Sequence, residues 1–168
     1  DVYVRDMRKS KPDLVSINSA GGPANSTSFD PNISDDGRYV VFESLASNLT
    51  TTDKDPSSIP DLTDLDNKDV FRRDLSNGKT VLVSFNFQNT RSATGESRNI
   101  AVSGNGRIVS WESQSRNLTA GFVERNDSVF AFDIFRRDMA TGVTTLVSGR
   151  LGSATQSGNN GANFPVVS

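Results

Sequence analysis

The sequence of 168 residues contains no cysteine and no histidine. Without cysteine the chain cannot form a disulfide framework, and without either residue it lacks the usual ligands of a zinc site. The same absences exclude Ser-His and Cys-His nucleophile pairs, so any chemistry would have to come from carboxylates, hydroxyls, lysine or arginine. Since no other catalytic motif is recognisable, we expect a protein that is not an enzyme.

Long apolar runs and a basic charge balance are also missing. The longest uninterrupted stretch of aliphatic and aromatic residues is Tyr39–Phe42, which is far too short for a membrane span. A net charge of −2 with interspersed charges provides no basic face for a nucleic-acid backbone. The sequence therefore predicts neither a membrane span nor nucleic-acid binding.

Small polar residues are abundant instead, with 23 Ser and 15 Asn in the chain. This richness, together with few lysines, favours an extracellular, cell-surface or periplasmic β protein over a cytosolic enzyme. The length fits one domain, and the 34% of hydrophobic residues suffice for a modest core. No signal peptide is visible and Asp1 already lies in a strand-like run, so we interpret the chain as a processed or excised piece of something larger.

One sequence block occurs three times. Asp1–Met7 returns as Asp69–Leu75 and again as Asp133–Met139, at spacings of 68 and 64 residues. A Leu-Val-Ser motif and a longer block that joins a turn to an apolar strand recur in the same order. They comprise Leu14–Ser16, Leu82–Ser84 and Leu146–Ser148 for the motif, and Ile33–Ser44 and Val102–Ser113 for the longer block. Recurrence of three blocks in one order indicates an internal repeat.

Each repeat contains four short β-prone runs separated by turn residues. In the first complete repeat the runs are Pro31–Ser34, Tyr39–Ser44, Asp69–Leu75 and Thr80–Ser84, with tight turns at Asp36-Gly37 and Asn77-Gly78. The second and third runs carry apolar residues on both faces, which is typical of a sheet sandwiched between neighbouring sheets. No segment has a sustained 3.6-residue apolar period, so very little helix is expected.

Four antiparallel strands per unit, repeated radially, form the blades of a β-propeller. The motifs I-S-x-D-G-R-Y-V-x-F-x-S, A-S-N-L, D-V-F-x-R-D-L and L-V-S, in this order, resemble the WD40-like repeats of TolB-type propellers. The resemblance covers nearly the whole chain, although the second unit has Asn105 and Trp111 where the pattern has Asp and Phe. It implies an all-β fold of propeller-type, four-stranded antiparallel blades. The alternative is a β-sandwich with coincidental similarity.

The expected organisation is one propeller-like repeat region over residues 1–168 with two complete units. It comprises a half blade at 1–29, full blades at 30–84 and 98–148, and the first strand of a next blade at 163–168. Propellers typically need four or more blades to close. Either the chain is a fragment of a longer propeller, or separate chains complete each other's blades by strand addition through exposed edge strands.

An acidic stretch distinguishes the first complete unit from the second. It predicts a calcium site whose oxygen ligands are Asp53, Asp55, Ser57, Asp61, Asp64, Asp66 and Asp69. Positions 1, 3, 5 and 9 counted from Asp53 carry oxygen side chains, which resembles the calcium loops inserted in other propellers. The usual glycine at position 6 is Ser58 here, and a solvated acidic loop whose Asp residues cap turns is the alternative.

Charged residues that recur in every unit are expected to be structural. The pairs Arg73-Asp74 and Arg137-Asp138 predict ion pairs or hydrogen bonds between neighbouring strands. The recurring Glu43 and Glu112 are unsuited to the role of a unique general acid for the same reason. Four aromatic residues outside the repeated blocks mark either a recognition surface or packing between blades. They are Phe85, Phe87, Phe122 and Phe132.

These features predict a non-catalytic, secreted or cell-surface scaffold that presents loops for protein or glycan binding. One alternative is a structural subunit that self-associates through its edge strands into a ring or fibre. A fragment of a propeller glycosidase is a further alternative, because such enzymes use paired carboxylates. Among the non-repeated carboxylates, Glu96 and Glu124 have no obvious partner base, so the sequence gives the glycosidase reading little support.

Overall fold

The protein is described by a computed structural model that covers residues 1–52, 68–124, 131–158 and 161–168. The described part of the chain has three antiparallel sheets and no helix. Its strands are β1 (Tyr3–Val4), β2 (Asp13–Leu14), β3 (Ser28–Ile33), β4 (Tyr39–Ser44), β5 (Asp69–Asp74), β6 (Lys79–Leu82), β7 (Ser97–Val102), β8 (Ile108–Ser113), β9 (Asp133–Asp138) and β10 (Val143–Leu146). The all-β prediction is therefore confirmed, and no helix within these ranges could span a membrane.

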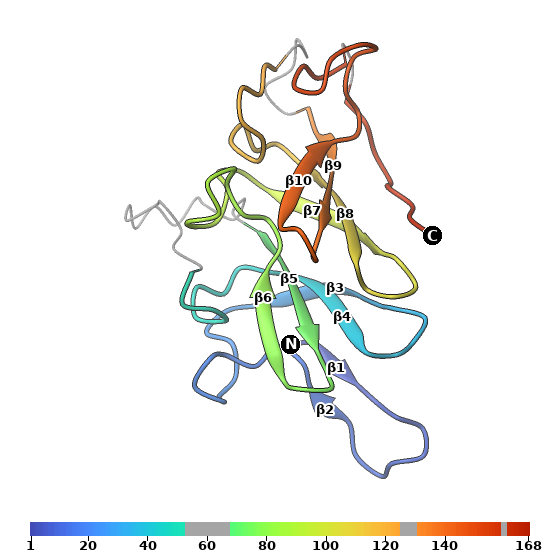
Figure 1. Cartoon of the computed structure of the whole chain (residues 1–168). Coiled ribbons are helices and arrows are strands. Elements are labelled where there is room, and N and C mark those ends of the chain that lie inside the picture. The colour runs from blue at the N-terminus through green and yellow to red at the C-terminus, as the bar shows by residue number, and fades with distance from the viewer. Residues whose placement is uncertain (53–67, 125–130, 159–160) are drawn as a thin grey trace.

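The sheets follow the order of the chain (Figure 1). Strands β1 and β2 form an N-terminal pair, β3–β4–β5–β6 form the first sheet, and β7–β8–β9–β10 form the second sheet. Within each four-stranded sheet, consecutive strands are hydrogen-bonded neighbours. The four β-prone runs predicted for each repeat thus make one four-stranded antiparallel sheet.

The first strand of each four-stranded sheet contains a β-bulge that the sequence analysis did not foresee. The pairing of β3 with β4 shifts between Phe29 and Asn32, and that of β7 with β8 shifts between Arg98 and Ala101. Within the bulges, Asp30 and Asn99 have φ angles of 42° and 52°. Because a bulge leaves one residue unpaired, it turns the backbone N–H of that residue out of its own sheet.

The hairpin turn between the first two strands explains why the two repeats differ at one pattern position. Gly37 and Gly106 both take φ = 68°, which glycine adopts without steric cost. The side-chain oxygens of Asp36 and Asn105 accept the backbone N–H two residues later, at 2.9 and 3.0 Å. Asparagine therefore replaces aspartate in the second repeat without loss of the turn.

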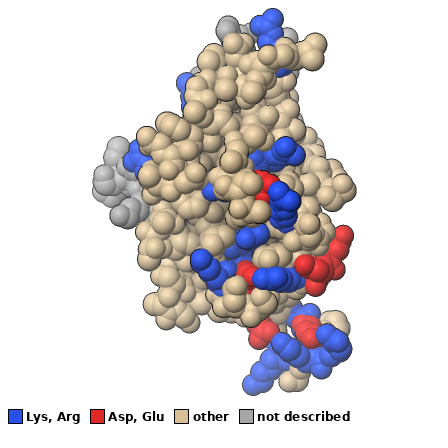
Figure 2. Space-filling view, in the orientation of Figure 1, with Lys and Arg blue, Asp and Glu red and all other residues tan. Residues whose placement is uncertain are grey.

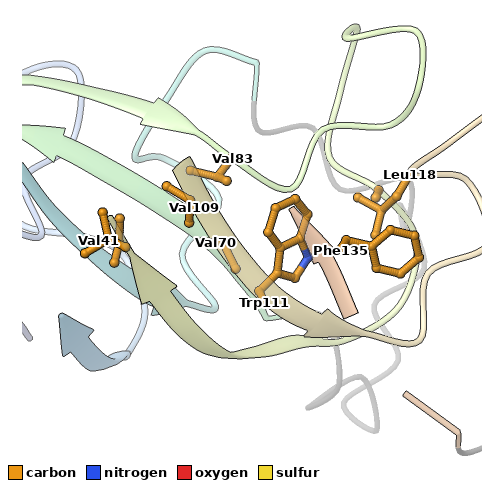
Figure 3. Packing of buried hydrophobic residues seen from close by; sticks show 9 residues of the cluster. Val41, Val70, Val83, Val109, Trp111, Leu118 and Phe135 are labelled. Atoms are coloured by element: carbon orange, nitrogen blue, oxygen red, sulfur yellow. The ribbon is translucent and has the colours of Figure 1, made fainter. Parts of the chain in front are cut away.

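The three sheets pack face to face, and alternate residues of the first sheet bury their side chains on opposite sides. Val41 and Val70 belong to a core shared with the second sheet, which includes Val109, Trp111 and Phe135 (Figure 3). Val40 and Phe42 belong to a second core, shared with the N-terminal pair. The prediction that these strands lie between two neighbouring sheets is confirmed for the first sheet.

The C-terminal residues 161–168 run beside the second sheet and form no strand there (Figure 1). The side chain of Phe164 is largely exposed, while its backbone N–H donates to Glu112 at 2.6 Å. The assignment of 163–168 to the first strand of a next unit stays a prediction.

Trp111 offers a test of how closely the two cores correspond. It is fully buried, its indole N–H has no partner among the described residues, and Phe42 occupies the matching position in the first sheet. We expect Trp111→Phe to cost about 1 kcal/mol or less, because the smaller ring also removes an unsatisfied donor. Trp111→Ala should cost about 3–5 kcal/mol. Urea unfolding followed by circular dichroism measures both, and equal losses would contradict the correspondence.

Candidate binding clefts

The predicted calcium ligands lie mostly outside the described residues. This applies to Asp53, Asp55, Ser57, Asp61, Asp64 and Asp66, so calcium binding stays a prediction. Among the described residues, no group of three or more acidic side chains is placed to hold a metal ion.

The seventh predicted ligand, Asp69, has a repeated structural contact. It is buried at the start of β5 and accepts a hydrogen bond from the hydroxyl of Ser84. The same bond joins Asp133 to Ser148 at 2.6 Å. In the first sheet the serine hydroxyl also accepts the backbone N–H of Val70, so it ties the first residues of β5 to the segment after β6.

Glu43 is a fully buried carboxylate at the contact between the two four-stranded sheets. Its Oε1 accepts the bulge N–H of Asn99 at 2.7 Å, and its Oε2 accepts a bond from Lys68 at 3.1 Å. Lys68 also contacts Glu96 at 2.9 Å. Burial raises the pKa of Glu43, and the Lys68 ammonium opposes this rise. These partners join β4 of one repeat to β7 of the next.

Glu112 repeats this arrangement one unit later. It is fully buried, its Oε1 accepts the N–H of Phe164, and Arg98 donates to its Oε2 at 3.1 Å. Phe164 has a φ of 59°, close to that of Asn99, and matches it in the repeat alignment. The prediction that these recurring glutamates are structural agrees with their contacts.

In each recurring Arg-Asp pair, the aspartate binds a different arginine, which lies in the turn just before the neighbouring strand. Arg38 holds Asp74 with two bonds, of 3.0 and 2.7 Å, and the shorter contact between Arg107 and Asp138 is also 2.7 Å. The Arg107 guanidinium lowers the pKa of Asp138 to about 2. Contacts between neighbouring strands were predicted, but their partners are not the adjacent arginines.

Those adjacent arginines, Arg73 and Arg137, point into clefts between the sheets. Each donates from Nη1 to a threonine of the next strand, Thr80 or Thr144, at 2.9 Å. Burial lowers the pKa of both guanidinium groups. Neither makes an ion pair with a carboxylate of the described ranges, so each is a partly desolvated cation with capacity for another acceptor.

Each of these arginines lies between two clefts, and the clefts occupy equivalent positions in the two repeats. The clefts beside Arg73 have volumes of about 670 and 750 Å³. Those beside Arg137 have volumes of about 300 and 170 Å³. The repeat therefore produces the same kind of cleft twice, with much more room in the first copy.

One side chain distinguishes the two arginines. In the second repeat Asn89 accepts a bond from Nη2 of Arg137 at 2.6 Å. The matching residue beside Arg73 is Gly21, which has no side chain. Gly21 and Asn89 both have positive φ angles, of 86° and 55°, and each donates its N–H to a carbonyl three residues earlier. The loops are thus equivalent, and only Arg73 lacks this acceptor.

Around Arg73, basic side chains outnumber acidic ones. Figure 2 shows Lys and Arg side chains gathered over the middle and lower parts of the molecule, with Asp and Glu among them. Four cations and three acids line the first cleft: Arg5, Arg8, Lys9 and Arg73 against Asp6, Asp13 and Asp36. Asp6 is paired with Arg8 at 3.2 Å, Asp13 is paired with Lys9 at 3.6 Å, and Asp36 accepts the backbone N–H of Arg38 at 2.9 Å. The clefts beside Arg73 therefore favour an anionic or strongly accepting group.

The four aromatic residues outside the repeats lie mainly in packed positions. Phe85 and Phe122 pack against the cores, and Phe132 lies under the Arg98 guanidinium at 3.6 Å from the ring centroid. Phe87 is about half exposed. Packing thus accounts for three of the four.

A comparison with models of protein families finds no match to this chain, and a comparison with curated protein sequences finds no significant match. The proposals below therefore rest on the repeats and on the geometry of the clefts.

Asp133 generates a prediction of pH dependence. Burial raises the pKa of this carboxyl to about 6, while Ser148 opposes the rise, and its Oδ2 has no hydrogen-bond partner among the described residues. Between pH 6 and pH 4 the folded protein takes up a proton that the unfolded chain does not, so this group adds stability as the pH falls.

We therefore expect Asp133→Asn to change the pH profile of stability. The free energy of unfolding of the variant minus that of the unchanged protein should be larger at pH 7.5 than at pH 4, by on the order of 2 kcal/mol. Urea unfolding at the two pH values measures this difference. A difference that does not vary with pH would show that Asp133 is ionised normally.

Proposed function

We propose that the chain is a non-catalytic binding module built from propeller-type repeats of the WD40-like, TolB-type kind. Successive four-stranded antiparallel sheets, stacked face to face in chain order, support this proposal. The recurring carboxylates also fit a non-catalytic role, since Glu43, Glu112, Asp74 and Asp138 each bind an arginine or lysine. The abundance of serine and asparagine favours a secreted, cell-surface or periplasmic location.

The ligand that the clefts favour is a protein or glycan group with an exposed oxygen acceptor, above all a carboxylate. The observation that carries this proposal is the contrast between Arg137, which Asn89 caps, and Arg73, which faces Gly21. The amide oxygen of Asn89 occupies in the second repeat the place that a ligand oxygen takes in the first. A planar guanidinium binds a carboxylate through two parallel bonds, which gives both affinity and orientation.

Gly21→Asn is the sharpest test. A side chain at Gly21 meets no atom within 4 Å of its Cβ, and asparagine tolerates a positive φ better than most residues. The variant should cap Arg73 from within the chain, as Asn89 caps Arg137, and so abolish ligand binding. Glucuronate and N-acetylglutamate serve as carboxylate probes of the glycan and protein type. Binding is followed by the NMR signal of the Arg73 guanidinium.

Matched variants separate binding from folding. Arg73→Ala should lose the probes, Arg137→Ala should retain them, and Asn89→Gly should open a second site at Arg137. If neither probe binds, or if Gly21→Asn binds as well as the unchanged chain, the proposed cleft function is wrong.

A further inference from the structure

Asn77 and Gly78 lie in the exposed turn between β5 and β6, and neither belongs to a core. The backbone N–H of Gly78 donates to the carbonyl of Asp74 at 2.8 Å. An asparagine that precedes glycine can react with its own backbone, because glycine has no Cβ to shield its nitrogen from the asparagine side chain. This turn is therefore a place where the chain can modify itself.

Both ends of the Asn77 amide are held by neighbouring groups. Its Oδ1 accepts the N–H of Lys79 at 2.9 Å, which draws electrons from Cγ and favours attack on that carbon. Its Nδ2 donates to Oδ2 of Asp74 at 3.0 Å, so a carboxylate lies beside the nitrogen that would leave. The amide is thus polarised at its carbon, and its nitrogen is held next to an acceptor.

Arg73 lies against the same turn. A Cβ built on Gly78 would be 3.4 Å from Nη2 of Arg73, so the guanidinium is close to the backbone of Gly78. A cation at this distance favours the form of the Gly78 amide that has lost its proton, and this form is the nucleophile. Three neighbours of the turn thus favour attack of the Gly78 nitrogen on Asn77.

We propose that Asn77 is a site of spontaneous covalent modification, at which water replaces the nitrogen of the side-chain amide. The nitrogen of Gly78 loses its proton and bonds to Cγ of Asn77, the bond from Cγ to Nδ2 breaks, and Nδ2 leaves as ammonia with that proton. Water then opens the cyclic imide, at Cγ to leave aspartate or at the main-chain carbonyl to leave isoaspartate. No atom changes its oxidation state.

The product is a carboxylate at the second cleft beside Arg73, because Asn77 lines that cleft. None of the described residues that line this cleft is acidic before the reaction. The product also replaces a hydrogen-bond donor to Asp74 by a like charge, so the bond that holds the turn to Asp74 is lost. The reaction needs no ligand, so the inference stands independently of the proposed carboxylate binding.

Asn105-Gly106 is the same pair of residues in a different environment. Gly106 is buried, and the ring of Tyr39 leaves no room for even a Cβ on it. Its carbonyl accepts a bond from Arg72 at 2.6 Å. Attack by the Gly106 nitrogen requires this packing to open, so Asn105 should react far more slowly than Asn77 in the folded chain.

The test is to hold the intact, folded chain at pH 8 and to digest samples with trypsin. Cleavage separates the three Asn-Gly pairs of the sequence, since Asn77 falls in residues 74–79, Asn105 in 99–107 and Asn160 in 151–168. Mass spectrometry of these fragments follows the conversion of amide to carboxyl. Asn77 should convert about tenfold faster than Asn105 in the folded chain, and at a similar rate in urea, where packing no longer shields Gly106.

Two variants act as controls. Asn77→Gln should stop conversion in its fragment, because the longer side chain cannot close the same ring. Thr141→Asn should create a second reactive site, because Gly142 repeats the turn. The N–H of Gly142 donates to the carbonyl of Asp138 at 2.8 Å, and a Cβ built on it would be 3.5 Å from Nη2 of Arg137.

The proposal is overturned if Asn77 stays unconverted or if Asn77 and Asn105 convert at equal rates in the folded chain. It is also overturned if the asparagine of Thr141→Asn stays unconverted, because the turn geometry would then not direct the reaction.

Discussion

The structure depends on a hydrogen bond between a buried glutamate and the bulge N–H of the next repeat. Without such an acceptor, the N–H of Asn99 would be a backbone donor at the contact between two sheets, where an unmet donor costs about 1–3 kcal/mol. Glu43 meets it with one oxygen and binds Lys68 with the other. The bond therefore fixes the distance and the register between one sheet and the next. The shared core that contains Val41, Val70 and Trp111 packs between the same two sheets.

The fold was largely predictable because its determinants recur in the sequence. Turn glycines, alternating apolar residues and the Glu-Ser ending of the second strand occur in both complete repeats, and the strands lie where these patterns place them. The bulge was missed because Asp30 and Asn99, and Phe164 at the matching position, share no chemical type. What they share is a backbone conformation and a backbone donor, and neither leaves a trace in side-chain patterns.

The candidate site was not predictable in the same way. The repeated arginines Arg73 and Arg137 were correctly read as structural in part, since each binds a threonine of the neighbouring strand. Their difference lies in a loop outside the repeated blocks, where Gly21 stands in one copy and Asn89 in the other. The repeated residues thus determine the fold, and the residues that differ between the repeats make the two clefts chemically different. The acidic stretch from Asp53 is the other such departure, and its calcium assignment lies outside the described residues.

The most direct measurement is the hydrogen exchange of two equivalent amides in the intact chain, those of Asn99 and Asp30. The account predicts that Asn99, bound to Glu43, exchanges about a hundredfold more slowly than Asp30 after correction for intrinsic rates, because exchange at Asn99 requires the two sheets to separate. Equal protection of the two amides would contradict the claim that the glutamate joins one repeat to the next.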